Sequence, residues 1–219
     1  METLITAHTG ADGKPDNSLE FVAYALESGA DALEVDVRRR GERLAIGHDA
    51  AGADAPLLEE VFRMTAACPG VRINCDLKEP GLEEDTALLA AREGLAERLI
   101  FSGTVDAFRR IPCGEIFLNL EEYVPDLYLN YREIPNFELQ AAETVCGVCG
   151  RTGIRTVNMY QGIVTRRFAE LLKKEGIGIS AWTVNDAWEL EWFLKLGVRN
   201  ITTRRARLAL ELRSARAGR

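Results

Sequence analysis

The sequence predicts an α/β fold, a closed (β/α)8 or TIM barrel, from three observations. Apolar runs with the alternation of strands recur along the chain, separated by segments with helical periodicity. They amount to eight strands and eight helices in strict alternation, which implies parallel strands joined by right-handed crossovers. The length of 219 residues suits eight such units in a single domain, residues 1–219. An open doubly wound sheet is the alternative, but no glycine-rich phosphate turn follows the first strand.

The first predicted unit runs from a short strand at residues 3–8 through a turn-rich segment to a helix. Asn17 or Ser18 can cap this helix, because short polar side chains accept hydrogen bonds from amides of the first turn. The helix spans 19–28 and ends at Gly29, which suits a left-handed C-terminal cap.

The next units repeat this order. A strand at residues 31–37 is followed by a basic turn and a short extension at 44–49. Pro56 is expected to open the following helix, since proline fits the first helical turn. The strand at 71–78 then shows the same alternation of apolar and polar residues as the strand at 31–37.

The remaining elements continue to the C-terminus. Residues 121–136 have no clean period and predict a long loop, a class of segment that is often functional. The other predicted elements are helices at 82–93, 104–110, 137–147, 165–176, 186–197 and 204–215 and strands at 98–102, 114–120, 153–160, 177–184 and 198–203.

Two acidic residues lie inside the strand at 31–37. Glu34 and Asp36 alternate there with aliphatic residues, and successive side chains of a strand point to opposite faces. The two acids therefore share one face, where burial is costly unless a cation or hydrogen bonds compensate them. The pattern predicts a metal-assisted acid–base site; a solvated edge strand with an incidental histidine nearby is the alternative.

Further polar residues lie where other predicted strands end. His8, Asp76, Lys78 and Trp182 are at or near strand ends, and His48 follows the short extension. The C-terminal ends of the strands form the active site in a closed barrel, so we expect these side chains to converge with Glu34 and Asp36. Three carboxylates favour Mg²⁺ or Ca²⁺ over Zn²⁺. A lysine beside that ion would be repelled unless an anion such as phosphate lay between them.

Composition limits the classes of partner. A net charge of −7 argues against a nucleic-acid partner, and no apolar run approaches the ~20 residues that span a membrane. The N-terminus has neither a basic leader nor an apolar signal core, and five cysteines are an odd number for a disulfide framework. We therefore expect a cytoplasmic protein with reduced thiols and no integral membrane association; the oligomeric state is not predicted.

Six motifs, in this order along the chain, resemble the glycerophosphodiester phosphodiesterase family. They are H-x-G at 8–10, P-D-N-S at 15–18, G-A-D-A-L-E-V-D-V at 29–37, H-D at 48–49, D-L-K at 76–78 and W-T-V-N at 182–185. Each motif is weak alone, but the order and spacing are specific and cover nearly the whole chain. The resemblance implies a TIM barrel that hydrolyses a small-molecule glycerophosphodiester to glycerol 3-phosphate and an alcohol, an activity of lipid and glycerol metabolism.

The resemblance also implies roles by position. Glu34, Asp36 and Asp76 would hold a divalent ion, Mg²⁺ or Ca²⁺. His8 and His48 would be the general acid and base, in an order that the sequence leaves open. Lys78 would act on the phosphate oxygens, and Trp182 would form an apolar wall for the glycerol or head group.

The chain departs from the family pattern at several positions. Thr9 stands where the family usually has an arginine that contacts phosphate, and Lys14 is a candidate substitute. Asp16 and Asp76 are each one methylene shorter than the family's glutamates. The inserted cap segment after the His-Asp pair is reduced or absent, at residues 50–57. Two alternatives therefore stay open: a catalytically weak barrel that binds a phosphorylated ligand, and a phospholipase of the sphingomyelinase D kind.

Overall fold

A computed structural model of the chain describes residues 2–49, 52 and 54–218. Eight parallel strands close into a barrel, because β1 pairs with β9 on one side and with β2 on the other. The predicted (β/α)8 barrel is thus confirmed. The barrel strands are β1 (Leu4–Ala7), β2 (Ala32–Arg40), β4 (Arg72–Leu77), β5 (Leu99–Gly103), β6 (Glu115–Asn119), β7 (Thr156–Tyr160), β8 (Gly178–Trp182) and β9 (Asn200–Thr203).

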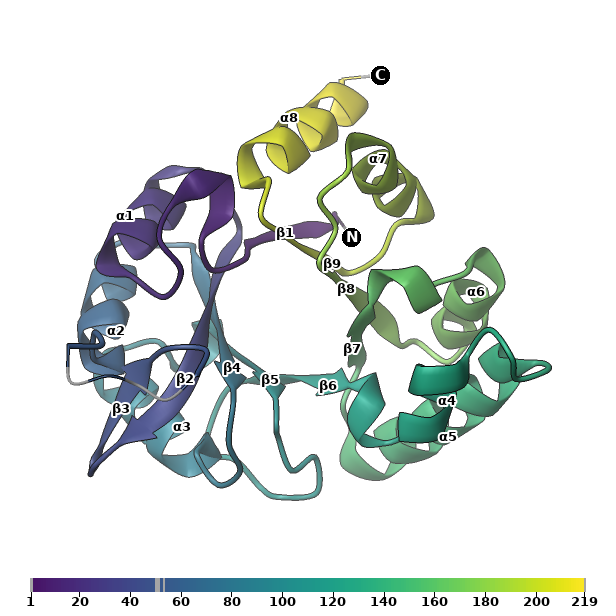
Figure 1. Cartoon of the computed structure of the whole chain (residues 1–219), viewed down its shortest axis with the longest axis horizontal. Coiled ribbons are helices and arrows are strands. Elements are labelled where there is room, and N and C mark those ends of the chain that lie inside the picture. The colour runs from purple at the N-terminus through teal and green to yellow at the C-terminus, as the bar shows by residue number, and fades with distance from the viewer. Residues whose placement is uncertain (1, 50–51, 53, 219) are drawn as a thin grey trace.

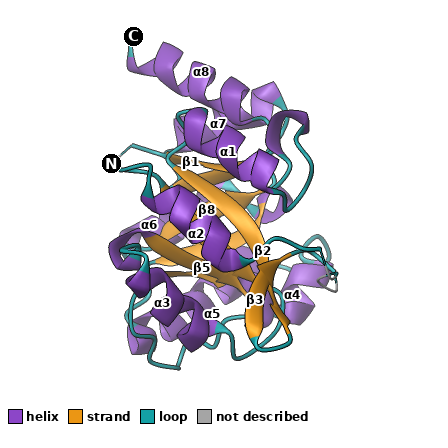
Figure 2. Cartoon of the chain, turned by 90° about the vertical axis from the view of Figure 1, so that its left-hand side faces the viewer, coloured by secondary structure: helices purple, strands orange, loops and turns teal. Residues whose placement is uncertain are grey.

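The helices lie around the outside of this ring of strands (Figure 1). A further strand, β3 (Arg43–Ile46), pairs antiparallel with the end of β2 and is not part of the ring (Figure 2). The helices are α1 (Leu19–Glu27), α2 (Leu58–Ala66), α3 (Glu83–Arg92), α4 (Pro125–Asn130), α5 (Phe137–Thr152), α6 (Arg166–Lys174), α7 (Ala187–Leu196) and α8 (Ala206–Ala217).

The helix predicted at 104–110 is wrong. Residues 104–114, all of which the structure describes, contain turns and bends but no helix, and they form the long connection between β5 and β6 (Figure 1). The Asp106 carboxylate accepts a hydrogen bond from the Phe108 amide at 2.9 Å, and the Asp106 amide donates to Glu83 Oε1 at 3.0 Å. Such local side-chain bonds compete with helix formation.

Two other predicted boundaries differ from the structure. The segment 121–136 was expected to be a loop, but it contains α4, which Pro125 opens at its first turn. Pro56 does not open α2: its carbonyl accepts from the Ile46 amide at 2.9 Å, and the helix begins at Leu58. Residues 50, 51 and 53 of the expected reduced cap lie outside the described part of the chain.

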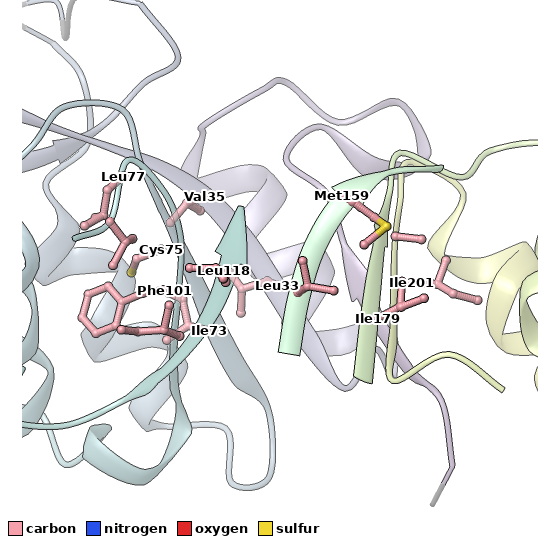
Figure 3. Close-up of a cluster of buried hydrophobic side chains, with 14 of the residues drawn as sticks. Leu33, Val35, Ile73, Cys75, Leu77, Phe101, Leu118, Met159, Ile179 and Ile201 are labelled. Carbon is pink, nitrogen blue, oxygen red and sulfur yellow. The ribbon is translucent and has the colours of Figure 1, made fainter. Parts of the chain in front are cut away.

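The apolar core lies between the barrel and its helices. Buried side chains from alternate positions of the strands form it, including Leu33, Val35, Ile73, Cys75, Leu77, Phe101, Leu118, Met159, Ile179 and Ile201 (Figure 3). Each fully buried side chain of this size stabilises the fold by roughly 1.5–3 kcal/mol. The intervening residues of the same strands are therefore left to fill the barrel interior.

The barrel interior is polar and internally bonded. Thr6 Oγ1 donates to Asn200 Oδ1 at 2.7 Å, and Asn200 Nδ2 donates to Ser180 Oγ at 2.9 Å. Across the barrel, Asn74 Nδ2 lies 3.0 Å from Ser102 Oγ. These bonds offset the cost of burying polar groups and give the side chains above them a fixed base. None of the helices within the described residues is long and apolar enough to span a bilayer.

Candidate active site

A cavity of about 480 Å³ opens at the C-terminal ends of the barrel strands. The structure brings together in its lining every residue that the sequence singled out for a site. These residues are His8, Glu34, Asp36, His48, Asp76, Lys78 and Trp182. The predicted convergence of strand ends is therefore found in the fold, whereas the roles of the residues are a separate question.

The three acids lie on two neighbouring strands. Asp36 of β2 is the register partner of Asp76 of β4, and Glu34 lies two residues before Asp36 on the same face. One carboxylate oxygen from each residue lies within 4.8 Å of the others. Glu34 and Asp36 are only 4% and 2% exposed. Buried acids this close repel one another unless a cation is shared among them.

Hydrogen bonds from neighbouring loops and strands orient these carboxylates. Asn17 holds Asp36 twice: its Nδ2 donates to Oδ2 at 2.7 Å, and its Oδ1 accepts from the Asp36 amide at 3.0 Å. The Thr9 amide donates to Glu34 Oε2 at 3.0 Å. Ser102 Oγ donates to Asp76 Oδ1 at 2.6 Å. The segment 9–17 thus orients Glu34 and Asp36, and Ser102 of β5 orients Asp76.

Lys78 supplies a positive charge directly to two of the acids. It is the first residue after β4, and its Nζ lies 2.8 Å from Asp36 Oδ1 and also bonds the Asp76 carboxylate. Burial lowers the pKa of this ammonium, but the carboxylates of Asp76 and Asp36 outweigh burial and raise it. Lys78 is therefore charged at neutral pH, and it contacts the acids rather than standing apart from them.

The negative charge of Glu34 is compensated less than that of Asp36. Burial raises its pKa to about 7; His8 and the Thr9 amide lower it, and the charges of Asp36 and Asp76 raise it. The Glu34 carboxyl therefore changes protonation near neutral pH.

His8 follows β1 and lies beside Glu34. Its Nδ1 is 3.0 Å from the Thr9 carbonyl oxygen and 3.9 Å from Glu34 Oε2, and its amide donates to the Thr203 carbonyl at 2.9 Å. Because a carbonyl oxygen only accepts, the contact with Thr9 requires the hydrogen on Nδ1. In the neutral ring, the lone pair is then on Nε2.

His48 lies on the rim, just after the β2–β3 hairpin. Its side chain is 72% exposed, and its Nδ1 is 3.3 Å from Asp49 Oδ1. Two backbone-directed bonds fix this turn: Arg38 Nε donates to the His48 carbonyl at 2.8 Å, and the Gly47 amide donates to the Asp36 carbonyl at 3.0 Å. Thus the hairpin attaches His48 to the strand that carries Asp36.

Trp182 and Glu121 also line the cavity. The ring of Trp182 lies against Tyr160, with centroids 6.1 Å apart. Trp182 Nε1 and Glu121 Oε2 are both buried without a hydrogen-bond partner among the described residues. Burial also raises the pKa of the Glu121 carboxyl. Both residues line the cavity, so an unpartnered donor and an unpartnered acceptor belong to side chains that a ligand in the cavity would contact.

Comparisons with known proteins support the family resemblance. No family model matches the chain. Two curated proteins named glycerophosphodiester phosphodiesterase are similar to it. The protein from Bacillus altitudinis is 24% identical over 92% of this chain and 94% of its own length. The protein from Caldanaerobacter subterraneus subsp. tengcongensis is 25% identical over 93% of this chain and 94% of its own length. The chain is therefore similar, over nearly its whole length, to curated glycerophosphodiester phosphodiesterases, the family that the sequence motifs indicated.

Solved structures with this family name share the fold. A glycerophosphodiester phosphodiesterase from Parabacteroides distasonis superposes with a TM-score of 0.73 at 18% identity, covering 99% of this chain and 98% of its own. A phosphodiesterase from Oleispira antarctica, solved with the product sn-glycerol 3-phosphate, superposes with a TM-score of 0.65 at 17% identity, covering 96% of each chain. At such identities the likeness concerns the fold.

The cavity also contains residues that sequence reasoning missed. Asn17 was considered only as a helix cap, but Ser18 caps α1 by accepting from the Phe21 amide at 3.0 Å, and Asn17 orients Asp36 instead. The signal was present in the P-D-N-S motif. The other lining residues that were not predicted include Asn119, Glu121, Asn158 and Arg204.

Proposed function

We propose that the chain hydrolyses glycerophosphodiesters to glycerol 3-phosphate and an alcohol. The observation that carries this proposal is the meeting of three carboxylates, two imidazoles and one ammonium in one cavity at the barrel mouth. The names of the curated relatives and the product bound to the Oleispira antarctica phosphodiesterase support the same reaction.

The acidic cluster suits a hard divalent cation, Mg²⁺ or Ca²⁺. Glu34, Asp36 and Asp76 offer oxygen atoms within 4.8 Å of one another, and Mg²⁺ and Ca²⁺ prefer carboxylate oxygen over nitrogen or sulfur. When bound, such an ion would offset the negative charge that develops on the nonbridging phosphate oxygens. Lys78 already neutralises two of these acids and would shift toward the phosphate as the ion takes over that task.

The two imidazoles suit the proton transfers of hydrolysis. One ring would take a proton from the attacking water while its oxygen forms a bond to phosphorus; the other would protonate the alkoxide as its bond to phosphorus breaks. The tautomer fixed by the Thr9 carbonyl leaves a lone pair on Nε2 of His8, which supports His8 as the base. His48, exposed on the rim, is then the acid beside the leaving alcohol.

The remaining lining residues would bind the substrate. Lys78 supplies charge for the phosphate, and the ring of Trp182 supplies an apolar wall. The unpartnered Trp182 Nε1 and Glu121 Oε2 suit hydroxyl groups of a glycerol moiety, because a hydroxyl can accept from the first and donate to the second.

An activity assay with matched histidine variants tests the proposal. Glycerophosphocholine and glycerophosphoethanolamine are incubated with Mg²⁺ or Ca²⁺, and glycerol 3-phosphate is measured for the wild type, His8→Ala and His48→Ala. We expect turnover by the wild type and a loss of at least about 100-fold in each variant, the usual scale of general acid–base catalysis. Turnover that survives His8→Ala refutes its assignment.

The same assay, with lysophospholipid and sphingomyelin added as substrates and a measurement of phosphorylated-ligand binding, decides between the alternatives. Absence of turnover on any diester, with retained binding of a phosphorylated ligand, favours the catalytically weak barrel that Thr9 motivates. Cleavage of lysophospholipid or sphingomyelin favours the sphingomyelinase D-like phospholipase.

A single domain over residues 1–219 and a cytoplasmic location stay predictions.

A further inference from the structure

Arg204 occupies the position next to His8 at the barrel mouth. Thr203, the last residue of β9, is the register partner of Ala7 in β1, so Arg204 follows directly beside the start of the 8–17 loop. Its carbonyl accepts from the Asp12 amide at 2.8 Å, and its amide donates to Asn185 Oδ1 at 2.9 Å. Its side chain lines the same cavity as His8 and the acids. The backbone around Arg204 is thus fixed from two loops.

The Arg204 guanidinium is held at the rim by one carboxylate. Nη1 lies 2.9 Å from Asp16 Oδ1, and Nη2 lies 3.2 Å from Asp16 Oδ2, a paired geometry that lysine does not reproduce. The group passes over Gly10, where an added Cβ would lie 3.0 Å from Nη1. Asp16 precedes Asn17, which orients Asp36, so Arg204 is linked to the acidic cluster through adjacent residues.

A phosphodiester entering this cavity meets mostly negative charge. The acids in its described lining are Asp16, Glu34, Asp36, Asp76, Glu121 and Glu122. The lysine and arginine residues of that lining are Lys78 and Arg204, and the Lys78 ammonium is bonded to Asp36 and Asp76 deep in the cavity.

Position 9 supplies no charge to the phosphate. The Thr9 side chain is buried, and its Oγ1 accepts from the Asn17 amide at 2.6 Å. Lys14 bonds Glu20 at 3.0 Å. Arg204, by contrast, has five N–H donors on its guanidinium, only some of which face Asp16, and its side chain is 43% exposed.

We propose that Arg204 is a phosphate-binding residue, whose guanidinium contacts the substrate phosphate on the His8 side of the cavity. Asp16 then holds the guanidinium at the rim in the absence of substrate and competes with the phosphate for it. The exposed Arg204–Asp16 pair contributes little to stability, so the guanidinium can exchange one anionic partner for another. The assignment rests on the proposed function.

A comparison of four variants tests it. Arg204→Ala removes the charge, Arg204→Lys keeps the charge without the fork, and Asp16→Asn frees the guanidinium. Arg205→Ala is the matched control, because Arg205 is exposed, adjacent in sequence and outside the cavity lining. We measure Kd for inorganic phosphate and for sn-glycerol 3-phosphate by calorimetry, and KM and kcat for glycerophosphocholine, with folding checked by circular dichroism.

We expect Arg204→Ala to raise both Kd values and KM at least tenfold while kcat changes less than threefold. Arg204→Lys is expected to give intermediate values and Arg205→Ala wild-type values. Asp16→Asn is expected to lower Kd, because it removes a competing anion. A purely structural clamp would weaken binding equally in Asp16→Asn and Arg204→Ala, and that result overturns the proposal.

The failures of the two proposals are distinguishable. A wild type that turns over diesters while Arg204→Ala keeps its KM and Kd overturns the role of Arg204 alone. A wild type that binds phosphate through Arg204 but turns over no diester overturns the proposed reaction alone. If Arg204→Ala does not fold, the Kd values of the other two variants decide: the proposal requires Arg204→Lys to raise Kd and Asp16→Asn to lower it. A wild type that binds neither anion overturns the assignment of Arg204.

Discussion

Lys78 Nζ lies 2.8 Å from Asp36 Oδ1 and also bonds Asp76, so one ammonium compensates two of the three acids that could hold a metal ion. Lysine and a bound divalent cation would therefore share the same carboxylates. This relationship links the stability of the metal-free protein to the chemistry of its site, because removing either cation leaves buried negative charge.

Lys78→Met is expected to destabilise the metal-free protein by on the order of 3 kcal/mol, because Asp36, with only 3% of its side chain exposed, loses its cationic partner. Urea unfolding measures this change, and Mg²⁺ or Ca²⁺ should restore more stability to the variant than to the wild type. Lys195→Met is the control, since Lys195 pairs with Glu191 on an exposed helix face and should change stability by less than about 0.5 kcal/mol. Equal unfolding midpoints for Lys78→Met and the wild type would contradict the interpretation.

The pKa of about 7 at Glu34 predicts that divalent-ion binding is linked to proton release. A protonated carboxyl is a poor ligand, so affinity should fall by up to about tenfold per pH unit as pH decreases below 7. Calorimetry in buffers of different ionisation enthalpy measures the released proton. Glu34→Gln should bind the ion more weakly and lose this part of the pH dependence; an affinity that is flat between pH 5.5 and 7.5 argues against the prediction.

The same shift predicts how the metal-free protein responds to pH. The folded state keeps the Glu34 proton over a range where the unfolded chain has lost it, from the ordinary value of 4.5 up to about 7. Because the native state then binds more protons, stability falls as pH rises through this window. Between pH 5 and pH 8, the midpoint of thermal unfolding should decrease less for Glu34→Gln than for the wild type.

The barrel and the acidic part of its candidate site could be predicted because both depend on strand alternation. Glu34 and Asp36 alternate with apolar residues, and the same pattern recurs around Asp76, so the sequence indicates both the strands and the face that carries the acids. Strand ends of a closed barrel meet at one mouth, and His8, Lys78 and Trp182 could therefore be placed there without knowledge of distances.

The features that were missed depend on contacts between distant residues. Arg204 belongs to an arginine-rich C-terminal region that resembles a solvated helix face, and only the pairing of β9 with β1 brings it beside Asp16. Asn17 lies where the sequence predicts a helix cap, but its side chain bonds Asp36 on the next strand. The helix expected at 104–110 failed because Asp106 bonds its own turn, which periodicity does not reveal.

Gly10→Ala is expected to be much more damaging than Gly13→Ala in the same loop. Both glycines have positive φ, +73° and +84°, so alanine costs about 1 kcal/mol of backbone strain at either position. At Gly10 the new Cβ would also overlap Asp16 Oδ1 and approach Arg204 Nη1, whereas nothing lies within 4 Å at Gly13.

The expected result at Gly10 is therefore a displaced Asp16–Arg204 pair in addition to the strain. Thermal unfolding and KM for glycerophosphocholine measure the two effects separately, and Gly13→Ala should keep the KM of the wild type. Equal KM values for the two variants would show that the position of the Asp16–Arg204 pair does not affect substrate binding.

Trp182→Phe is expected to weaken recognition of the glycerol moiety while leaving the chemistry at phosphorus in place. Phenylalanine keeps an apolar ring beside Tyr160 but lacks the buried Nε1 hydrogen, which has no partner among the described residues. The loss of one hydrogen bond, about 0.5–1.5 kcal/mol, should raise KM for glycerophosphocholine by a factor between about 2 and about 12.

A substrate without hydroxyl groups isolates this bond from the change in ring size. Bis(4-nitrophenyl) phosphate has no glycerol, so its KM should change less in Trp182→Phe than the KM of glycerophosphocholine does. Trp192→Phe is the matched control, because Trp192 packs against Phe193 in α7 and does not line the cavity. If both substrates lose affinity equally in Trp182→Phe, the ring contributes only by shape, and the indole N–H does not bind a hydroxyl.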